Sequence, residues 1–375
     1  MQTVGVIGGG QLARMMQPAA IALGINLQVF AEAEGSSAHN AVTRVGDYTD
    51  LDQLRDFAKD VDVITFDHEH VPPELLKKLE AEGVKVRPGP DALIHAQNKL
   101  VMRKKLAELG LPQPQWAEVS SVSELQAFIE VQGSEVVVKT PIGGYDGKGV
   151  RVIASVSEVS DWLENISDFG GSLLAEQKVD FVSEAAQLVA RRPQGEIRHW
   201  PLVQTIQSGG VCSEVVAPFP SESLGDAGAE IGHGIANGLG VTGVLAVEMF
   251  VMPDGRLLVN ELAMRPHNSG HFSIEGSNTS QFEQHLRAVL DLPLGDTAMR
   301  SGTAVMVNLL GVHENNNFYE HYPQLMDKYP EVKFHLYEKA ARAGRKMGHL
   351  TVLGSDAAEL LETGRAARSL IYGEA

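Results

Sequence analysis

The segment GVLAVEMFVMPDGRLLVNELAMRP, residues 243–266, consists of two apolar runs separated by the dipeptide Asp254-Gly255. An Asp-Gly pair between apolar runs is typical of a two-residue β-hairpin turn. With this pair at the tip of a hairpin, Glu248 lies directly opposite Glu261. Side chains in such a cross-strand pair are about 5 Å apart, and two ionised carboxylates at that distance repel each other. The segment therefore predicts a hairpin that needs a bound cation, or a shared proton, between two glutamates.

Magnesium is the cation that this pair suits best, because Mg²⁺ is commonly bound by one or two carboxylates together with substrate phosphates. Mn²⁺ accepts the same oxygen ligands. Strand alternation puts Asn260 on the opposite face from Glu261 and returns Arg265 to the face of Glu261, where it suits an anion beside the metal. The alternative interpretation is two solvated glutamates on an exposed strand edge.

A glycine-rich segment, KTPIGGYDGKGV at residues 139–150, follows the strand-like run EVVVK. It lacks the spacing of a Walker A loop, yet N–H groups between glycines can fold over a polyphosphate and exclude water. Lys148 would add a positive charge to such a loop. We therefore expect a lid at residues 143–149, and the alternative is a flexible hairpin turn.

A second glycine cluster lies at the N-terminus, where VGVIGGGQLARMM places Gly8 and Gly10 between a strand pattern and a helix pattern. Glu32 follows about twenty residues later, which completes the outline of a dinucleotide-binding fingerprint. N–H groups at the start of a helix bind phosphate in either case. NAD binding, binding of another phosphate and a turn without a ligand are all compatible with this motif.

Strand and helix patterns divide the chain into three parts, of class α/β and α+β. Residues 1–95 alternate between strands and helices, which is typical of a parallel sheet covered on both faces. Residues 96–294 mix short alternating strands with helices, which favours an α+β domain built on antiparallel sheet. Residues 295–375 are expected to form a small C-terminal domain.

Composition and charge exclude several classes of protein. The chain has 375 residues and a formal net charge of −17 at pH 7, which argues against nucleic acid or an anionic membrane as the main partner. Cys212 is the only cysteine, so no intramolecular disulfide or cysteine zinc cluster is expected. The N-terminus lacks the pattern of a secretory signal and no apolar run is long enough to span a bilayer. We expect a cytoplasmic protein.

The glycine loop, the opposed glutamates and NELAMRPHNSGH together resemble the ATP-grasp enzymes, and among them the N5-carboxyaminoimidazole ribonucleotide synthetase family. GVIGGGQLARMM and RAGRKMGHL extend the resemblance over nearly the whole chain. It implies an N-terminal Rossmann-like (pre-ATP-grasp) domain, an ATP-grasp domain, a small C-terminal domain and a homodimer. It also implies the use of ATP and bicarbonate to carboxylate 5-aminoimidazole ribonucleotide, through carboxyphosphate, in purine biosynthesis. The unstable product implies a mutase downstream.

The resemblance also implies a role for each matching residue. Glu248 and Glu261 resemble the Mg²⁺ ligands. Contacts with ATP are implied for Lys99, Lys139, Gly143, Gly144, Gly147, Gly149, Glu176, Gln177, Lys178, Val179, Glu184, Gln207 and Asn260. Contacts with aminoimidazole, bicarbonate or carboxyphosphate are implied for Tyr145, Asp146, Lys148, Arg265, His267 and Asn268. Contacts with the ribonucleotide are implied for Gly8, Gly10, Gln11, Leu12, Glu69, Arg345 and Lys346, with Asp67 as a weaker candidate. The N-terminal turn would then serve the ribonucleotide and not NAD.

The chain departs from the family pattern at two positions. Gln207 stands where some relatives have histidine near ATP, and Ala263 stands where many ATP-grasp enzymes have a metal-binding asparagine. Two other polar segments carry weaker signals. Pro266 and Gly270 disfavour the helix that a zinc site through His267 and His271 would require, so a polar substrate loop is expected. The basic segment at residues 190–200 is expected to be a solvated hairpin.

Three other functions are compatible with parts of the sequence. A formate-dependent glycinamide ribonucleotide transformylase would share the metal pair but use formate and a different amine. A nucleotide-binding regulator would bind ATP without turnover. A nicotinamide dehydrogenase would use the N-terminal glycine turn and release no phosphate.

Overall fold

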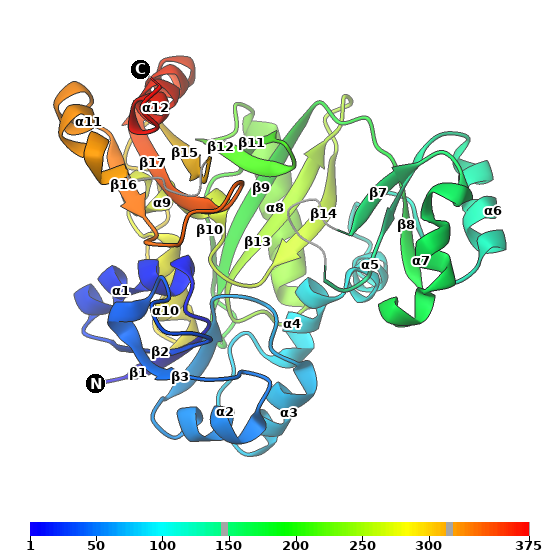
Figure 1. Cartoon of the computed structure of the whole chain (residues 1–375), viewed down its shortest axis with the longest axis horizontal. Coiled ribbons are helices and arrows are strands. Elements are labelled where there is room, and N and C mark those ends of the chain that lie inside the picture. Colours follow the sequence, from blue (N-terminus) through cyan, green and yellow to red (C-terminus); the bar gives the residue numbers. More distant parts are fainter. Residues whose placement is uncertain (144–148, 313–317, 375) are drawn as a thin grey trace.

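The computed structural model describes residues 1–143, 149–312 and 318–374. Three sheets form the frame, and the small sheet lies apart from the other two (Figure 1). Among the described residues, no helix has the length and apolar character needed to cross a membrane. Gly144, Tyr145, Asp146, Gly147 and Lys148, which were assigned to the lid, lie outside the described residues.

The N-terminal sheet has four parallel strands in the order β3-β2-β1-β4. Its strands are β1 (Thr3–Ile7), β2 (Asn26–Ala31), β3 (Val42–Val45) and β4 (Val63–Phe66). The accompanying helices are α1 (Gln11–Leu23), α2 (Leu51–Ala58) and α3 (Pro73–Ala81). Helices α4 (Pro90–Gln97) and α5 (Lys99–Glu108) then lead to the second sheet. The strand–helix alternation of the sequence is thus a parallel α/β unit, because a parallel pair needs a crossover connection.

The small sheet has four antiparallel strands in the order β5-β8-β6-β7. They are β5 (Trp116–Val119), β6 (Val136–Lys139), β7 (Val150–Ile153) and β8 (Leu173–Gln177). Helices α6 (Val122–Gln132) and α7 (Ser160–Glu164) belong to this unit, and its own apolar cluster includes Leu125, Val138 and Val159. In the sequence, the predicted lid at residues 143–149 falls between β6 and β7.

The large sheet has nine strands and continues into the C-terminal part of the chain, because β12 pairs with β15. Its first six strands are β9 (Ser183–Arg191), β10 (Ile197–His199), β11 (Val203–Ser208), β12 (Val211–Ala217), β13 (Gly243–Val251) and β14 (Leu257–Ala263). The C-terminal strands are β15 (Thr303–Leu310), β16 (Lys333–Leu336) and β17 (Lys346–Gly354). The remaining helices are α8 (Glu222–Gly238), α9 (Ser273–Gly276), α10 (Gln281–Val289), α11 (Tyr322–Lys328) and α12 (Ala357–Ile371).

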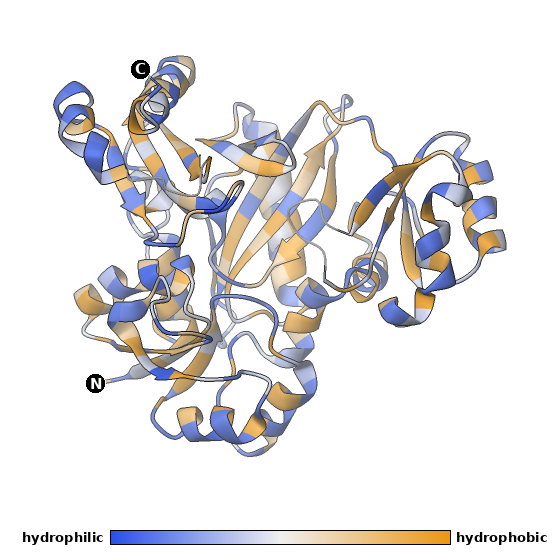
Figure 2. Cartoon of the chain, in the orientation of Figure 1, coloured by the Kyte–Doolittle hydropathy of each residue, from blue (hydrophilic) through white to orange (hydrophobic). Residues whose placement is uncertain are grey.

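Apolar residues follow the strands of the large sheet (Figure 2). One buried cluster joins Val4 of the N-terminal sheet, Phe282 of α10 and Tyr337 of the C-terminal part. A second cluster joins Phe66 of the N-terminal sheet with Leu245 of β13. These shared cores fix the N-terminal turn relative to the large sheet, since buried apolar contacts resist separation.

The β13–β14 hairpin pairs Glu248 with Glu261, as predicted. The turn itself was predicted wrongly, because the loop has three residues, Pro253–Gly255, and not two. Val251 pairs with Leu257, the Met252 N–H donates to the Arg256 carbonyl at 2.8 Å, and Gly255 has a φ of 83°. A β-bulge then makes Asn260 the extra residue, since Met249 pairs with Val259. The loop shifts the register by one residue and the bulge shifts it back.

Candidate active site

Each of the two opposed glutamates contacts a basic side chain. His267 Nε2 lies 3.0 Å from Glu248 Oε1, and Lys99 Nζ lies 3.0 Å from Glu261 Oε1. Burial raises the pKa of Glu248, but the hydrogen bond and positive charge of His267 outweigh burial, so that the pKa lies below its usual range. The repulsion expected from the hairpin is therefore relieved by the Lys99 ammonium and by the contact of His267 with Glu248, which come from two other segments.

Glu184, on the neighbouring strand β9, is a third carboxylate of this site. Burial, and then the negative charge of Glu248, raise its pKa to about 7. A carboxyl with this pKa exchanges its proton near neutral pH, which is unusual outside functional sites.

A pair of lysines lies beside the glutamates. Lys139, at the end of β6, places Nζ 2.7 Å from Glu176 Oε2 and 3.2 Å from Asn260 Oδ1. Burial raises the pKa of Glu176, but the charges of Lys139 and the buried Arg103 outweigh it and the pKa falls to about 2. The N–H of Lys99 donates to the carbonyl of Pro141 at 2.9 Å, which ties the start of α5 to the segment after β6. Two cations are thus held next to the carboxylates.

Strand alternation predicted that the Asn260 side chain points away from this group, and this prediction was wrong. Its side chain accepts a hydrogen bond from Lys139, while the adjacent Glu261 contacts Lys99. The bulge is the physical reason, because it breaks the strict alternation of side chains at this point of β14.

The residues present fit a Mg²⁺ ion that is shared with a substrate. Among the described residues, no group of three or more His, Cys, Asp and Glu side chains is arranged to hold a metal. Glu248 and Glu261 nevertheless keep about a third of their side-chain surface exposed, 33% and 37%. Two carboxylates completed by phosphate oxygens and water are a normal Mg²⁺ ligand set.

The loop after β14 supplies His267, Arg265 and Asn268. Gln281, at the start of α10, binds both main-chain groups of His267: Oε1 accepts from its N–H and Nε2 donates to its carbonyl, each at 2.8 Å. Asn268 is buried and exchanges two hydrogen bonds with Asn308 of β15, at 2.9 Å and 2.7 Å. The His267 ring is therefore held toward Glu248 by a fixed main chain.

Arg265 points to the N-terminal unit, where its Nε lies 2.7 Å from Glu69 Oε2. The second oxygen of Glu69 accepts from the N–H of Met264 at 3.3 Å. Burial lowers the pKa of Arg265, but the charge of Glu69 and its hydrogen bond have the larger effect. The pKa therefore lies above its ordinary value, and the guanidinium stays charged. Arg265 and Glu69 thus connect the glutamate pair with the N-terminal turn.

At that turn, Gly8 has a φ of 105°, and a Cβ on Gly10 would lie 1.9 Å from Asp67 Oδ2. Only glycine fits at these two positions. Asp67 Oδ1 accepts from the N–H of Ala13 at 2.8 Å. Burial raises the pKa of Asp67. The Asp67 side chain therefore already binds one of the free N–H groups at the start of α1.

Lys339 faces this turn from the C-terminal part and contacts the side-chain oxygen of Gln11. Burial lowers the pKa of Lys339 to about 8, the charge of Asp67 opposes this, and Arg345 and Lys346 lower it further. Lys339 thus lies opposite Gln11, and the charges of Arg345 and Lys346 are close enough to Lys339 to lower its pKa. Such a group suits the phosphate of a small molecule.

Comparison with known proteins agrees with this arrangement. An N5-carboxyaminoimidazole ribonucleotide synthase of Mycobacterium tuberculosis is 48% identical over 377 residues, which cover 99% of this chain and 88% of that protein. The chain belongs to the N5-carboxyaminoimidazole ribonucleotide synthase family. Family models match as a ribonucleotide synthetase preATP-grasp domain at residues 1–97, an ATP-grasp domain at 104–282 and a phosphoribosylaminoimidazole carboxylase C-terminal domain at 304–363.

Solved structures of N5-carboxyaminoimidazole ribonucleotide synthases have the same fold. The Thermus thermophilus enzyme is 34% identical, with a TM-score of 0.87 over 99% of each chain. The Aspergillus clavatus enzyme, in complex with ADP and 5-aminoimidazole ribonucleotide, is 31% identical, with a TM-score of 0.88 over 99% of this chain and 98% of that chain. The predicted ATP-grasp fold and the predicted family are confirmed.

Within this synthase, the other predicted ATP contacts lie along the small sheet and the neighbouring strands. Gly143 and Gly149 are the first and last residues of the predicted lid, and their φ values are 76° and 70°. Lys178 pairs with Glu135 at the surface. Gln207 lies at a bulge opposite Cys212. Gln177 accepts weakly from the N–H of Gln115 at 3.5 Å, and Val179 follows β8 in the loop that leads to β9.

The Leu12 side chain is only 4% exposed and packs in the core, so it is not available to a ligand. Lys339 and Gln281 were not predicted from the sequence. The run EKAARAGRK, which contains Lys339, Arg345 and Lys346, was a usable signal for the first. Gln281 carried none, because its role depends on the position of a loop fourteen residues away.

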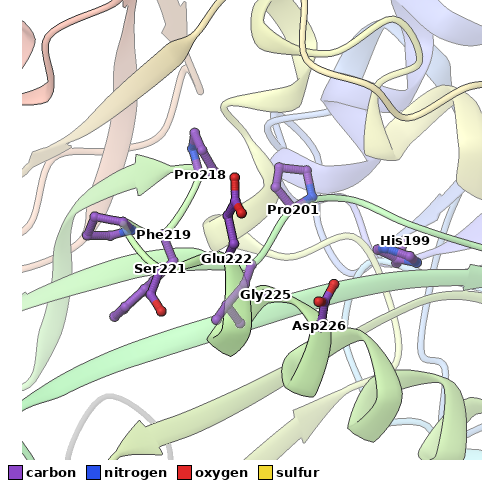
Figure 3. Close-up of a pocket in the computed structure, with 10 residues that line it drawn as sticks. His199, Pro201, Pro218, Phe219, Ser221, Glu222, Gly225 and Asp226 are labelled. Carbon is purple, nitrogen blue, oxygen red and sulfur yellow. The ribbon is translucent and has the colours of Figure 1, made fainter. Parts of the chain in front are cut away.

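Two other features lie outside this site. The basic segment forms a hairpin in which Arg192 pairs with Glu196 at 2.8 Å, which agrees with a structural role. A cavity of ≈ 560 Å³ opens at the start of α8, between His199, Leu202, Phe219 and Asp226 (Figure 3). None of the predicted site residues lines it.

Proposed function

We propose that this chain is the ATP-dependent ligase that carboxylates 5-aminoimidazole ribonucleotide with bicarbonate. The products are N5-carboxyaminoimidazole ribonucleotide, ADP and phosphate, and the pathway is purine biosynthesis. The observation that carries the proposal is the direct pairing of Glu248 with Glu261 beside Lys99 and Lys139, in a chain of this synthase family.

In the first step, a bicarbonate oxygen attacks the γ-phosphorus of ATP, the bond to the β–γ bridging oxygen breaks, and ADP leaves. Lys139 and Lys99 are the side chains that would neutralise the phosphates. Glu248 and Glu261 would hold Mg²⁺, which when bound supplies further positive charge to the reacting phosphate. Glu184 would accept hydrogen bonds from the ATP ribose, and the segment from Glu176 to Val179 would contact adenine.

In the second step, the amine of aminoimidazole ribonucleotide attacks the carboxyl carbon of carboxyphosphate. The carbon–oxygen bond to the phosphate breaks, and the amine proton leaves with the phosphate. Arg265 and His267 are the groups that would face the carboxyphosphate anion. The lid, with Tyr145, Asp146 and Lys148, would exclude water from this labile anhydride.

The ribonucleotide phosphate would bind between Gln11 and the basic group of Lys339, Arg345 and Lys346. This assignment rests on the local excess of positive charge in a chain whose net charge is −17. The glycine turn at Gly8 and Gly10 would border the ribose, with Glu69 near the imidazole.

Five further properties of this chain are also proposals. The chain divides into domains at residues 1–95, 96–294 and 295–375. The protein is a homodimer, it acts in the cytoplasm, and its product passes to a mutase. Mg²⁺ is its metal, with Mn²⁺ as a substitute.

The test is phosphate release from Mg²⁺-ATP and bicarbonate, with and without 5-aminoimidazole ribonucleotide. We expect strong stimulation by this amine and none by glycinamide ribonucleotide with formate. Glu248→Gln and Glu261→Gln should each lower the stimulated rate by about 10²-fold or more, a usual cost for a group that stabilises transition-state charge. Stimulation by glycinamide ribonucleotide and formate alone would instead identify a transformylase.

A further inference from the structure

Arg103 of α5 is a fully buried arginine to which neither the family resemblance nor the proposed function gives a role. Its guanidinium has three acceptors: Nη1 donates to the Val259 carbonyl at 2.7 Å, Nη2 to the Asn260 carbonyl at 2.9 Å, and Nε to Glu176 Oε1 at 2.6 Å. Two of the acceptors are main-chain carbonyls of β14, and the third lies on β8. The side chain therefore joins the large sheet to the small sheet.

The two carbonyls belong to the bulge of β14. Asn260 is the extra residue there, and Val259 precedes it. If β14 paired without a bulge from the same three-residue loop, Glu261 would face Val247, and its side chain would turn to the other face of the sheet. The bulge is thus the feature that keeps Glu261 opposite Glu248. Arg103 supplies hydrogen bonds to both carbonyls at this irregular point of an edge strand.

The other end of the network reaches the lysine assigned to ATP. Glu176, which binds Arg103 through one oxygen, holds Lys139 through the other at 2.7 Å. Lys139 in turn donates to the Asn260 side chain at 3.2 Å. Arg103, Glu176, Lys139 and Asn260 therefore form a closed ring, which fixes the distance between β6, β8 and β14.

We propose that Arg103 is a positioning residue for catalysis, which holds the bulge of β14 and thereby sets Glu261 and Lys139 for Mg²⁺-ATP. The proposal rests on the proposed function of these two residues. Arginine is required because its planar guanidinium reaches three fixed acceptors at once, whereas a lysine ammonium is a single point on a flexible stem.

The first test compares Arg103→Lys with wild type in the full-length enzyme. We expect the Mg²⁺-ATP dissociation constant, measured by calorimetry, and the Mg²⁺ concentration for half-maximal phosphate release each to rise at least tenfold. The KM for aminoimidazole ribonucleotide should change less than twofold, because the Arg103 guanidinium donates to Glu176 and to the Val259 and Asn260 carbonyls, away from the contact between Lys339 and Gln11. A merely structural arginine would lower the melting temperature without this selective change.

The matched control is Arg192→Lys, because Arg192 is also a mostly buried arginine. This variant breaks its bonds to Glu196 and to the Asp291 carbonyl, and neither partner belongs to the site around Glu248 and Glu261. We expect it to lower the melting temperature and to leave Mg²⁺-ATP binding within twofold of wild type. Equal effects of the two variants on Mg²⁺-ATP binding would overturn the proposal.

A second variant, Arg103→Gln, covers the case in which Arg103→Lys does not fold. It removes the guanidinium and leaves Glu176 paired with Lys139. We expect the same selective loss of Mg²⁺-ATP affinity, and wild-type affinity in this variant would overturn the proposal. The binding measurement needs no aminoimidazole ribonucleotide. If that amine did not stimulate phosphate release by wild type, the proposed reaction would be contradicted. The role of Arg103 in Mg²⁺-ATP binding would still be tested by the binding measurement.

Discussion

Glu184 shows how one side chain links this site to pH. Its pKa in the folded protein, about 7, lies above the ordinary value of 4.5. The folded protein therefore keeps a proton between pH 4.5 and 7 that the unfolded chain releases, so Glu184 makes the free energy of unfolding fall as pH rises through this window. Glu184→Gln should remove this fall.

The free energy of unfolding of Glu184→Gln, relative to that of wild type, should therefore increase by about 1 kcal/mol as pH rises from 5 to 7. This value is reduced because the group is half-exposed. Urea unfolding at a series of pH values measures the difference. A difference that does not change with pH would contradict the raised pKa.

Lys339 leads to a second prediction at the scale of one residue. With a pKa of about 8, it is protonated below pH 8 and loses its charge above it. If it binds the ribonucleotide phosphate, the KM for aminoimidazole ribonucleotide should rise by roughly tenfold between pH 7.5 and pH 9.5, the value of one charged hydrogen bond. Lys339→Arg should keep this KM flat, because arginine stays charged. A parallel rise in both enzymes would exclude Lys339 as the cause.

Single residues differ in how well the sequence predicts them. Glu248 and Glu261 were predicted because a short hairpin brings them together, and hairpin pairing follows from local pattern. The role of Arg103 was not predicted, because the segment NKLVMRKKLAELGL contains several basic residues and only tertiary packing decides which of them is buried. Long-range polar contacts of this kind leave no periodic signal in the sequence.

The β13–β14 hairpin makes the same point at the scale of an element. The predicted two-residue turn was wrong and so was the predicted direction of Asn260, yet the predicted glutamate pair was right because the loop and the bulge shift the register in opposite directions. The bulge depends on contacts with Arg103 and Lys139, which lie on other elements. A local pattern therefore could not predict it.

The loop conformation can be tested with a pair of alanine substitutions. Gly255 has a φ of 83°, so Gly255→Ala should destabilise the protein by about 1–2 kcal/mol through backbone strain alone. Gly225, in α8, has open space at its Cβ and no positive φ, so Gly225→Ala should stabilise by about 0.5–1 kcal/mol. Neither should change kcat. Thermal unfolding with matched rate measurements gives both values, and a neutral Gly255→Ala would contradict the positive φ at Gly255.

At the scale of the whole molecule, the site exists only because three parts of the chain meet. The N-terminal unit contributes the glycine turn and Glu69. The two other sheets contribute the glutamates and Lys139, α5 contributes Lys99, and the segment before β17 contributes Lys339. The sequence predicted the three parts and the family. It did not predict that β15 extends the large sheet, because strand order depends on packing and not on local pattern.

The contact between Glu69 and Arg265 tests this convergence. Glu69→Gln keeps the shape but removes the charge that faces Arg265 at 2.7 Å. We expect the KM for aminoimidazole ribonucleotide to rise about tenfold, the cost of one charge-assisted hydrogen bond. Mg²⁺-ATP affinity should stay unchanged, because Glu69 has no contact with Lys99 or Lys139. A loss confined to Mg²⁺-ATP affinity would show that Glu69 acts on ATP and not on the ribonucleotide.

The most direct measurement follows the oxygen atoms of bicarbonate. The enzyme is incubated with Mg²⁺-ATP, aminoimidazole ribonucleotide and ¹⁸O-labelled bicarbonate, and the phosphate released is analysed by ³¹P NMR. If bicarbonate attacks the γ-phosphorus in the site formed by Glu248 and Glu261, each phosphate formed before the label exchanges with water should carry one ¹⁸O atom. Phosphate without ¹⁸O, released at the rate of carboxylation, would show that water attacks ATP and would contradict the account.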